Sequence, residues 1–165
     1  MSILIREATI EDAEPLLSMV HKLAAYEKKK PEDVKLSLDK IKKHGFSERP
    51  YFQSLIVECD GQAVGYALYY YSYAASAGAP AIFLEDIFVE EAYRHRGIGK
   101  GLFAELAAIA VKLECCRLEW NAFTWNEKAI EFYKSLGAIQ RGDVFQFRLL
   151  GEGLVRMAES NVTLY

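Results

Sequence analysis

The sequence lacks long apolar runs, an excess of basic residues and any cysteine-rich stretch. Its first residues reach Arg6 and Glu7 after a very short apolar run, so we expect neither a secretory signal nor a membrane partner. A net charge of -3 offers no general attraction to phosphate backbones, so we expect no nucleic acid partner. Because no targeting signal is visible, we expect a cytoplasmic protein.

Cysteine occurs three times, as Cys59, Cys115 and Cys116. An odd count with two adjacent thiols fits neither a disulfide framework nor the spacing of metal ligands. We therefore expect reduced thiols and no metal. A catalytic cysteine is the sharper alternative, although no histidine lies near Cys115 or Cys116 in the sequence.

Proline is also scarce, with four residues, whereas 52% of the chain is hydrophobic. This composition is typical of a folded globular chain and argues against long disordered tracts. A length of 165 residues suits one compact core. We expect a single domain over residues 1–165, without internal repeats.

The first half of the chain predicts two helices followed by a β-hairpin. Apolar residues recur at helical spacing in residues 9–30, and a weaker helical pattern covers residues 31–45. Residues 52–59 and 62–73 are rich in β-branched and aromatic side chains, and the intervening Asp60-Gly61 is a strong hairpin signal.

The second half predicts alternating strands and helices. A loop at residues 74–80 precedes a strand at residues 81–89, and a long apolar stripe predicts a helix over residues 98–113. The remaining expected elements are a strand at residues 116–121, a helix from Asn126 to Gly137 and a last strand at residues 144–150.

A glycine-rich loop, residues 94–101 with the sequence Arg-His-Arg-Gly-Ile-Gly-Lys-Gly, joins the strand at residues 81–89 to the long helix. Helix N-termini carry unpaired N–H groups and the positive end of the helix dipole, and glycine lets a phosphate approach the backbone. Arg94, Arg96 and Lys100 add positive charge. The loop therefore predicts an anion site.

Two other phosphate-binding patterns do not fit this loop. The P-loop needs G-K-[ST] at a spacing that is absent. The dinucleotide fingerprint needs a small residue where Leu102 stands, and it should open a β-α-β run rather than follow a hairpin. The remaining pattern, [R/Q]-x-x-G-x-[G/A] at the end of a central strand, is matched at every fixed position.

That pattern resembles the coenzyme A signature of the GNAT superfamily of N-acetyltransferases. Residues 23–27 (LAAYE), 84–89 (LEDIFV), 125–127 (WNE) and 132–134 (FYK) are similar to the diamine branch, the spermidine/spermine acetyltransferase-like enzymes. The resemblance implies an α/β (α+β) fold, with a mixed, largely antiparallel twisted sheet of six to seven strands and about four helices. It also implies acetyl-CoA as cosubstrate, a small primary amine as acceptor and a homodimer.

The resemblance assigns most cosubstrate contacts to backbone amides. The amides of Phe88 and Val89 would pair with the pantetheine arm, and Asn126 would contact the arm further along. Tyr133 would hydrogen-bond the coenzyme A sulfur and act as general acid, while the amine attacks the thioester directly. The implied cofactor-binding residues are Phe88, Val89, Arg94, Arg96, Gly97, Ile98, Gly99, Lys100, Gly101, Asn126 and Tyr133.

Three carboxylates are candidates for the general base. Glu85 and Asp86 are adjacent on a strand, so they point to opposite faces unless a bulge turns one of them. The resemblance favours Glu85 as the base, acting through water, with Asp86 binding the cationic amine. Glu119, on the strand expected next door, is the third candidate.

The substrate pocket resembles the family in part. Tyr26 and Glu27, at the end of the first helix, match positions that help to form the amine pocket. Polyamine-specific members bring an acid and an aromatic residue to the substrate where residues 74–80 read Ala-Ala-Ser-Ala-Gly-Ala-Pro, and Val144 stands where a tryptophan is common. A shorter diamine or a lysine/thialysine-like amino acid is therefore as plausible an acceptor as a polyamine.

Two rival functions remain open from the sequence. A GNAT-like domain could hold coenzyme A as a ligand or sensor without efficient transfer. The acceptor could also be a protein N-terminus or lysine, which would require an open peptide groove.

Overall fold

A computed structural model describes residues 2–160, and the chain divides into two compact units, residues 1–125 and residues 126–165. The first unit carries all the strands of the described residues, and the second carries two helices. The expected single domain over residues 1–165 stays a prediction.

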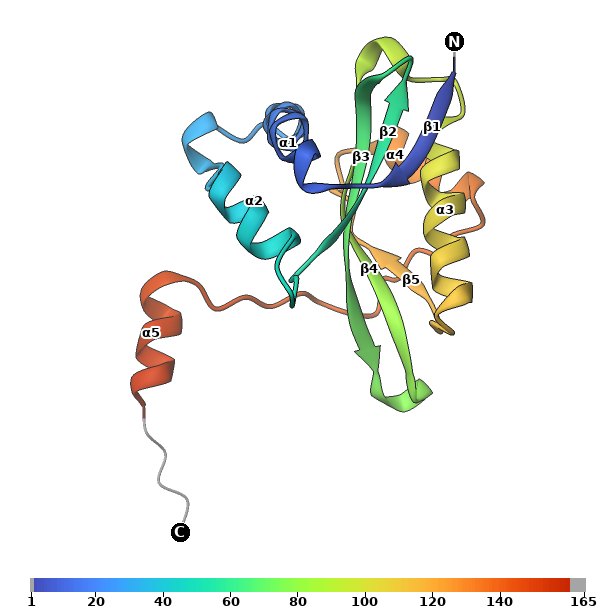
Figure 1. The fold of residues 1–165 in the computed structure, drawn as a ribbon. Coiled ribbons are helices and arrows are strands. Elements are labelled where there is room, and N and C mark those ends of the chain that lie inside the picture. The colour runs from blue at the N-terminus through green and yellow to red at the C-terminus, as the bar shows by residue number, and fades with distance from the viewer. Residues whose placement is uncertain (1, 161–165) are drawn as a thin grey trace. The chain divides into compact units, whose positions relative to one another are not determined.

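A five-stranded sheet in the order β1-β2-β3-β4-β5 forms the centre of the first unit (Figure 1). Antiparallel pairings join β1 through β4, and β4 pairs with β5 in parallel. The α/β class and the mixed, largely antiparallel sheet are confirmed. The strands are β1 (Ile3–Glu7), β2 (Gln53–Cys59), β3 (Gln62–Ala74), β4 (Ala79–Val89) and β5 (Leu118–Trp120).

The β2–β3 connection is the predicted two-residue hairpin. Asp60 and Gly61 both have positive φ, 48° and 84°, as a type I′ turn requires.

The β3–β4 connection is tighter than the expected loop at residues 74–80. Its turn is a single 3-10 segment, Ala75–Ala77, followed by Gly78 at a φ of 62°.

Helices cover both faces of the sheet (Figure 1). In the first unit α1 (Ala13–Tyr26) and α2 (Leu38–Gly45) lie on one face, and α3 (Ile98–Lys112) lies on the other. The second predicted helix is shorter than expected, because Ser37 accepts a hydrogen bond from the Lys40 amide and starts α2 only at Leu38. The core on the α1 face is built from Ala13, Leu16, Met19, Ile41, Ile56, Tyr66, Leu68 and Phe88.

Arg6 and Asp12 fix the position of α1 against β1. The Arg6 guanidinium donates to both Asp12 carboxylate oxygens, at 2.8 and 2.9 Å, and this pairing holds the pKa of Asp12 below its usual range. Asp12 also accepts from the Thr9 amide at 2.7 Å. The start of α1 is therefore anchored, and its C-terminal end is carried to the carboxyl half of β4.

The second unit contains α4 (Glu127–Ser135) and α5 (Gly151–Glu159). The helix expected from Asn126 is confirmed: the Asn126 side chain accepts from the Ala129 amide at 3.3 Å, and Gly137 follows with a φ of 86°. The strand expected at residues 144–150 is wrong, which leaves five strands in residues 2–160. A strand needs a partner with a free edge, and no other strand occurs in the described part of this unit.

The sequence pattern also did not predict α5. This helix begins after Leu150 and carries an ion pair at helical spacing, with 3.6 Å between Arg156 Nη1 and Glu152 Oε2. The described residues therefore contain five α-helices instead of the expected four.

Candidate active site

The glycine loop begins α3 without a capping side chain. Gly97 is the N-cap residue with a φ of 79°, and α3 starts at Ile98. The first four amide groups of a helix, here Gly97 to Lys100, have no partner within the helix. Together with the helix dipole they form a site suited to a phosphate group.

Gly101 has a packing role that differs from the expected cofactor contact. Its N–H donates to the Gly97 carbonyl at 2.9 Å, the first bond of the α3 ladder. A Cβ at this position would lie 2.9 Å from Ile5 Cδ1. Glycine therefore lets α3 approach β1 closely, and its amide belongs to the helix.

Arg94 fastens the loop to the end of β4. Its Nε donates to the Val89 carbonyl at 2.9 Å, and its guanidinium carbon lies 5.5 Å from the Tyr26 ring centroid and 5.9 Å from that of Phe88. Arg96 stacks similarly, 5.7 Å from the Tyr93 ring. The two arginines thus contact aromatic rings on α1, on β4 and in the turn before the loop.

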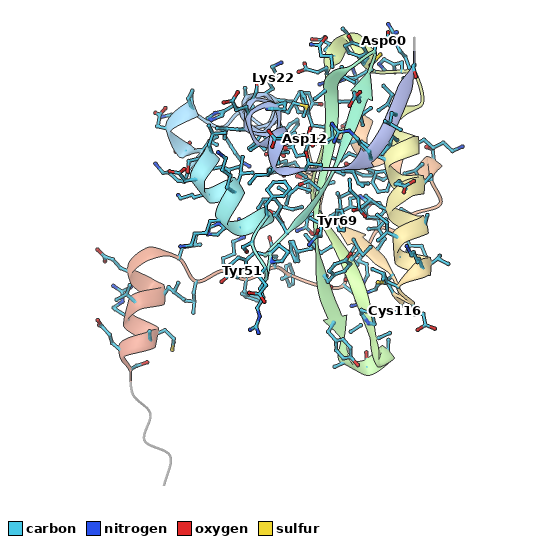
Figure 2. The ribbon with its side chains drawn as sticks, viewed as in Figure 1. Asp12, Lys22, Tyr51, Asp60, Tyr69 and Cys116 are labelled. Atoms are coloured by element: carbon cyan, nitrogen blue, oxygen red, sulfur yellow. The ribbon has the colours of Figure 1, made fainter. Side chains whose placement is uncertain are left out.

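A pocket of about 340 Å³ lies where α1, the end of β4 and the loop meet. Lys22, which extends from α1 in Figure 2, pairs with Glu90 across it, with 2.5 Å between Nζ and Oε1. The pocket therefore joins the end of α1 to the entrance of the anion site. It is lined by Lys22, Tyr26, Phe88, Glu90, Glu91 and Arg94.

The last residues of β4 leave one edge without a strand partner among residues 2–160, because pairing with β5 ends at Leu84. The Glu90 amide donates to the Val64 carbonyl on β3 at 2.9 Å. By the alternation of an antiparallel ladder, the Phe88 amide also faces β3 and the Val89 amide faces the open edge. Val89 is thus positioned for the expected pantetheine contact, whereas Phe88 contributes its ring to the pocket.

A β-bulge at Glu85 places two carboxylates on one face of the sheet. Leu68 pairs with Asp86 and Tyr69 pairs with Leu84, so Glu85 is the extra residue. Tyr66 Oη donates to Asp86 Oδ2 at 3.2 Å. Burial, and after it the charge of Glu85, raises the pKa of Tyr70, four residues from Tyr66 on the same face of β3. The Glu85 and Asp86 side chains therefore both lie on the face of the sheet that α1 covers.

Asp86 is the most strongly perturbed of these carboxyl groups. Burial raises its pKa to about 6, and the charges of Glu85 and Glu27 act in the same direction. The Tyr66 hydroxyl and the Lys29 ammonium act in the opposite direction. A carboxyl that titrates near neutrality is suited to proton transfer at physiological pH.

The end of α1 completes this acidic cluster. Glu27 follows the last helical residue, and its Oε2 lies 2.6 Å from Lys29 Nζ. Lys28 has a φ of 63°, and its ammonium lies 4.5 Å from the Trp125 ring centroid. One carboxylate and one aromatic ring, each beside a lysine ammonium, therefore lie at the end of α1.

Glu119 shares the same face but has a partner of its own. Its neighbour Trp120 packs against Phe103 of α3, so Glu119 points to the α1 face. Arg117 Nε lies 2.9 Å from Glu119 Oε1. This pairing makes Glu119 a weaker candidate for the base than Glu85 or Asp86.

Asn126 and Tyr133 belong to the second unit. The Asn126 side chain caps α4, and the Tyr133 ring lies 5.6 Å from that of Phe132. Their expected contacts with coenzyme A stay predictions.

Sequence reasoning missed three groups in the site, namely Tyr66, Lys29 and Trp125. Tyr66 alternates with Leu68 and Tyr70 along β3, so the hairpin register could have placed it on the pocket face. The pairs Lys29–Glu27 and Lys28–Trp125 depend on the turn after α1, which carries no sequence signal that we can identify.

The alternative of a catalytic cysteine gains no support from the structure. Partial burial raises the pKa of the Cys115 thiol, which disfavours the thiolate that a nucleophile needs. The described residues contain no cluster of three or more His, Cys, Asp or Glu side chains arranged to hold a metal ion. None of the helices within residues 2–160 has the length and apolarity that crossing a membrane requires.

Gly97→Ala is expected to weaken acetyl-CoA binding by at least about 10-fold, because the left-handed φ disfavours a side chain by roughly 1–2 kcal/mol and the open amides would turn. Gly78→Ala is the matched control: Gly78 also has a positive φ, and a Cβ at either glycine meets nothing within 4 Å. Both variants should lose similar thermal stability, and only Gly97→Ala should change the Kd measured by calorimetry. Equal Kd values would contradict the anion site.

Comparison with known proteins gives one family. The model described as Acetyltransferase (GNAT) family matches residues 17–138. The thialysine N-epsilon-acetyltransferase of Sus scrofa is 36% identical over 168 residues, covering 95% of this chain and 98% of that protein. The spermidine/spermine N(1)-acetyltransferase-like protein 1 of Homo sapiens is 32% identical over 82% of this chain, which spans 20% of that protein. A solved integron cassette protein from the mobile metagenome of V. cholerae has a TM-score of 0.82 at 29% identity, covering 97% of this chain and 99% of that one.

Proposed function

Because the chain belongs to the GNAT acetyltransferase family and is an N-acetyltransferase, we propose that it transfers an acetyl group from acetyl-CoA to a lysine-like amino acid. The acceptor would be the side-chain amine of a small molecule such as thialysine. One observation carries the proposal: Glu27 already pairs with a primary ammonium, that of Lys29, and the charges of Glu27, Glu85 and Lys29 all act on Asp86. A substrate ammonium of the same chemistry would take the place of Lys29.

The donor would lie along β4 and the start of α3. The Val89 amide would bind the pantetheine arm, and the open amides from Gly97 to Lys100 would bind the pyrophosphate. Arg94 would hold these two segments in register through its bond to the Val89 carbonyl. The same strand carries Glu85 and Asp86, so β4 would position the thioester and the carboxylates together.

The reaction would proceed by direct attack. The bound ammonium gives a proton to the Glu85–Asp86 pair, Glu85 accepting it through water. The neutral amine then attacks the thioester carbonyl, the C–N bond forms and the C–S bond breaks. Tyr133 protonates the leaving thiolate, as the family resemblance implies, and the second proton that the nitrogen loses on becoming an amide restores the Tyr133 phenol. Activity is lost as the pH falls through about 6, where Asp86 gains a proton.

The lysine-like acceptor is preferred over a long polyamine because the β3–β4 turn carries no charge. Residues 74–80 offer only small, neutral side chains and Pro80, so a distal ammonium group would find no carboxylate there. A relative that matches along nearly its whole length acts, by its name, on thialysine. Both observations favour a short acceptor with one side-chain amine.

The proposal includes a cytoplasmic homodimer. All three cysteines are free thiols, which suits a reducing compartment. The side chains of Phe145 and Phe147 are 89% and 90% exposed, and a second copy would cover them. Light scattering should give the mass of two chains at micromolar concentration, and a monomer at all concentrations would contradict the dimer.

A panel of acceptors tests the proposed function. Release of free coenzyme A thiol should be fastest with thialysine, lysine or ornithine, slower with putrescine and spermidine, and slowest with a peptide N-terminus. Acceptors with the side-chain amine replaced by a hydroxyl are matched controls and should give no product. Fastest turnover with a peptide would overturn the small-molecule assignment, and tight acetyl-CoA binding without any thiol release would favour the sensor.

A further inference from the structure

We infer that Tyr66 is a positioning residue for the reaction: its buried hydroxyl holds the Asp86 carboxylate in the orientation that receives the substrate ammonium. This inference rests on the proposed function, because it gives Asp86 its place in the amine site. Tyr66 would act only through Asp86 and would not itself touch the substrate.

The Tyr66 ring is fixed by the core. The residue is 0% exposed and belongs to the cluster of buried side chains beneath α1, together with Leu16 and Met19. Its ring centroid lies 6.2 Å from that of Phe88, the residue that pairs with it on β4. Close packing restricts the ring, so the hydroxyl is held beside β4.

The hydroxyl has a single described partner, the Asp86 carboxylate. Tyr66 Oη donates to Asp86 Oδ2 at 3.2 Å. Phenylalanine would fill the same core space without a polar atom, and burying a hydroxyl is unfavourable unless it is hydrogen-bonded. The contribution of this hydroxyl to the site is therefore the hydrogen bond to Asp86.

The acidic residues around Asp86 oppose its ionisation, so a hydrogen-bond donor such as the Tyr66 hydroxyl is needed to stabilise its charged form. Asp86 faces Glu85 from its own strand and Glu27 from the end of α1, and both charges oppose its ionisation. Lys29, after α1, and Tyr66, on β3, favour it. When a substrate displaces Lys29 from Glu27, the Tyr66 hydroxyl is the fixed donor that remains.

Tyr66 stays protonated over the working pH range. Burial, and after it the charge of Asp86, raises the pKa of the Tyr66 hydroxyl well above its usual value. The group is thus a permanent donor rather than a second proton acceptor. Its hydrogen bond lowers the pKa of Asp86, so removal of the hydroxyl should raise that pKa further.

Tyr66→Phe is the direct test, with the pH dependence of kcat/KM for the best amine as the readout. We expect the acidic limb to move to higher pH, and kcat/KM at pH 6.5 to fall roughly threefold to tenfold. At pH 9, where Asp86 is ionised in both proteins, the loss of rate should be smaller than at pH 6.5, and the Kd of acetyl-CoA should not change. A loss of rate that is equal at all pH values would indicate damage to the fold and overturn the positioning role.

Tyr69→Phe is the matched control. Tyr69, labelled in Figure 2, also lies on β3, is 3% exposed and has its hydroxyl beside Tyr71. It points to the opposite face of the sheet from Tyr66 and Tyr70. This variant also removes the hydroxyl of a buried tyrosine, and its acidic limb should stay where it is in the wild type.

A titration without turnover separates this inference from the proposed function. In ¹³C NMR of the substrate-free protein, the Asp86 carboxyl should titrate near pH 6, and the Tyr66 ring signals should follow the same midpoint. The Tyr69 ring signals should not. If acetyl transfer is absent but both midpoints agree, the proposed function fails and the pairing stands. If the Tyr66 signals are independent of Asp86, the inference fails whatever the activity.

Discussion

Tyr133→Phe is expected to lower kcat by roughly 10²- to 10⁴-fold and to leave the Kd of acetyl-CoA nearly unchanged. The leaving group is a thiolate, and a positioned phenol would protonate it as the C–S bond breaks. The change removes one oxygen atom and keeps the ring beside Phe132 on α4. Turnover should be measured with both substrates saturating, and binding by calorimetry.

Tyr73→Phe provides the comparison, because Tyr73 is 68% exposed on β3 and the proposed mechanism gives it no role. Its kcat should equal that of the wild type. An unchanged kcat in Tyr133→Phe would remove this residue from the mechanism. A parallel loss of acetyl-CoA binding would indicate that Tyr133 holds the donor rather than acts as an acid.

Asp86→Asn and Glu85→Gln should have different effects, because the proposed mechanism gives the two carboxylates different roles. Asp86→Asn should raise KM for the amine by about 10- to 100-fold and abolish the acidic limb of kcat/KM near pH 6. Glu85→Gln should lower kcat by about 100-fold, since it removes the proposed base. In Glu85→Gln, the acidic limb caused by Asp86 should also move to lower pH, because the charge of Glu85 raises the pKa of Asp86.

Glu119→Gln is the control for both carboxylate variants. Glu119 lies on the same face but is paired with Arg117, so its replacement should change kcat and KM by less than about threefold. The pH–rate profiles of all three variants are the measurement. A limb that survives in Asp86→Asn and disappears in Glu119→Gln would reassign the base to Glu119.

The predictable parts of the fold depend on local signals. The Asp60-Gly61 hairpin requires two residues with positive φ, and the sequence supplies the pair that adopts it most readily. The helices starting at Ile98 and after Asn126 carry an apolar stripe or a capping side chain. The strand expected at residues 144–150 fails because strand formation depends on a partner, which local pattern does not reveal.

The site was predictable only in its residue types. Adjacent Glu85 and Asp86 predict opposite faces, and only the register of β3 against β4 reveals the bulge that brings them together. Gly101 belongs to a cofactor pattern by its place in the loop, yet a Cβ there would lie 2.9 Å from Ile5 Cδ1 on β1. The Tyr66–Asp86 bond joins residues 20 positions apart and depends on the same register.

A single-turnover experiment tests the central claim most directly. The protein is saturated with acetyl-CoA labelled in the acetyl group, mixed with the best amine and quenched at intervals, and the label is located by mass spectrometry. Direct attack predicts that the label passes to the amine nitrogen as coenzyme A thiol appears, with no label on the protein at any time. Label that first appears on a side chain such as Cys116 and then moves to the amine would contradict it, and so would the absence of acetylated amine.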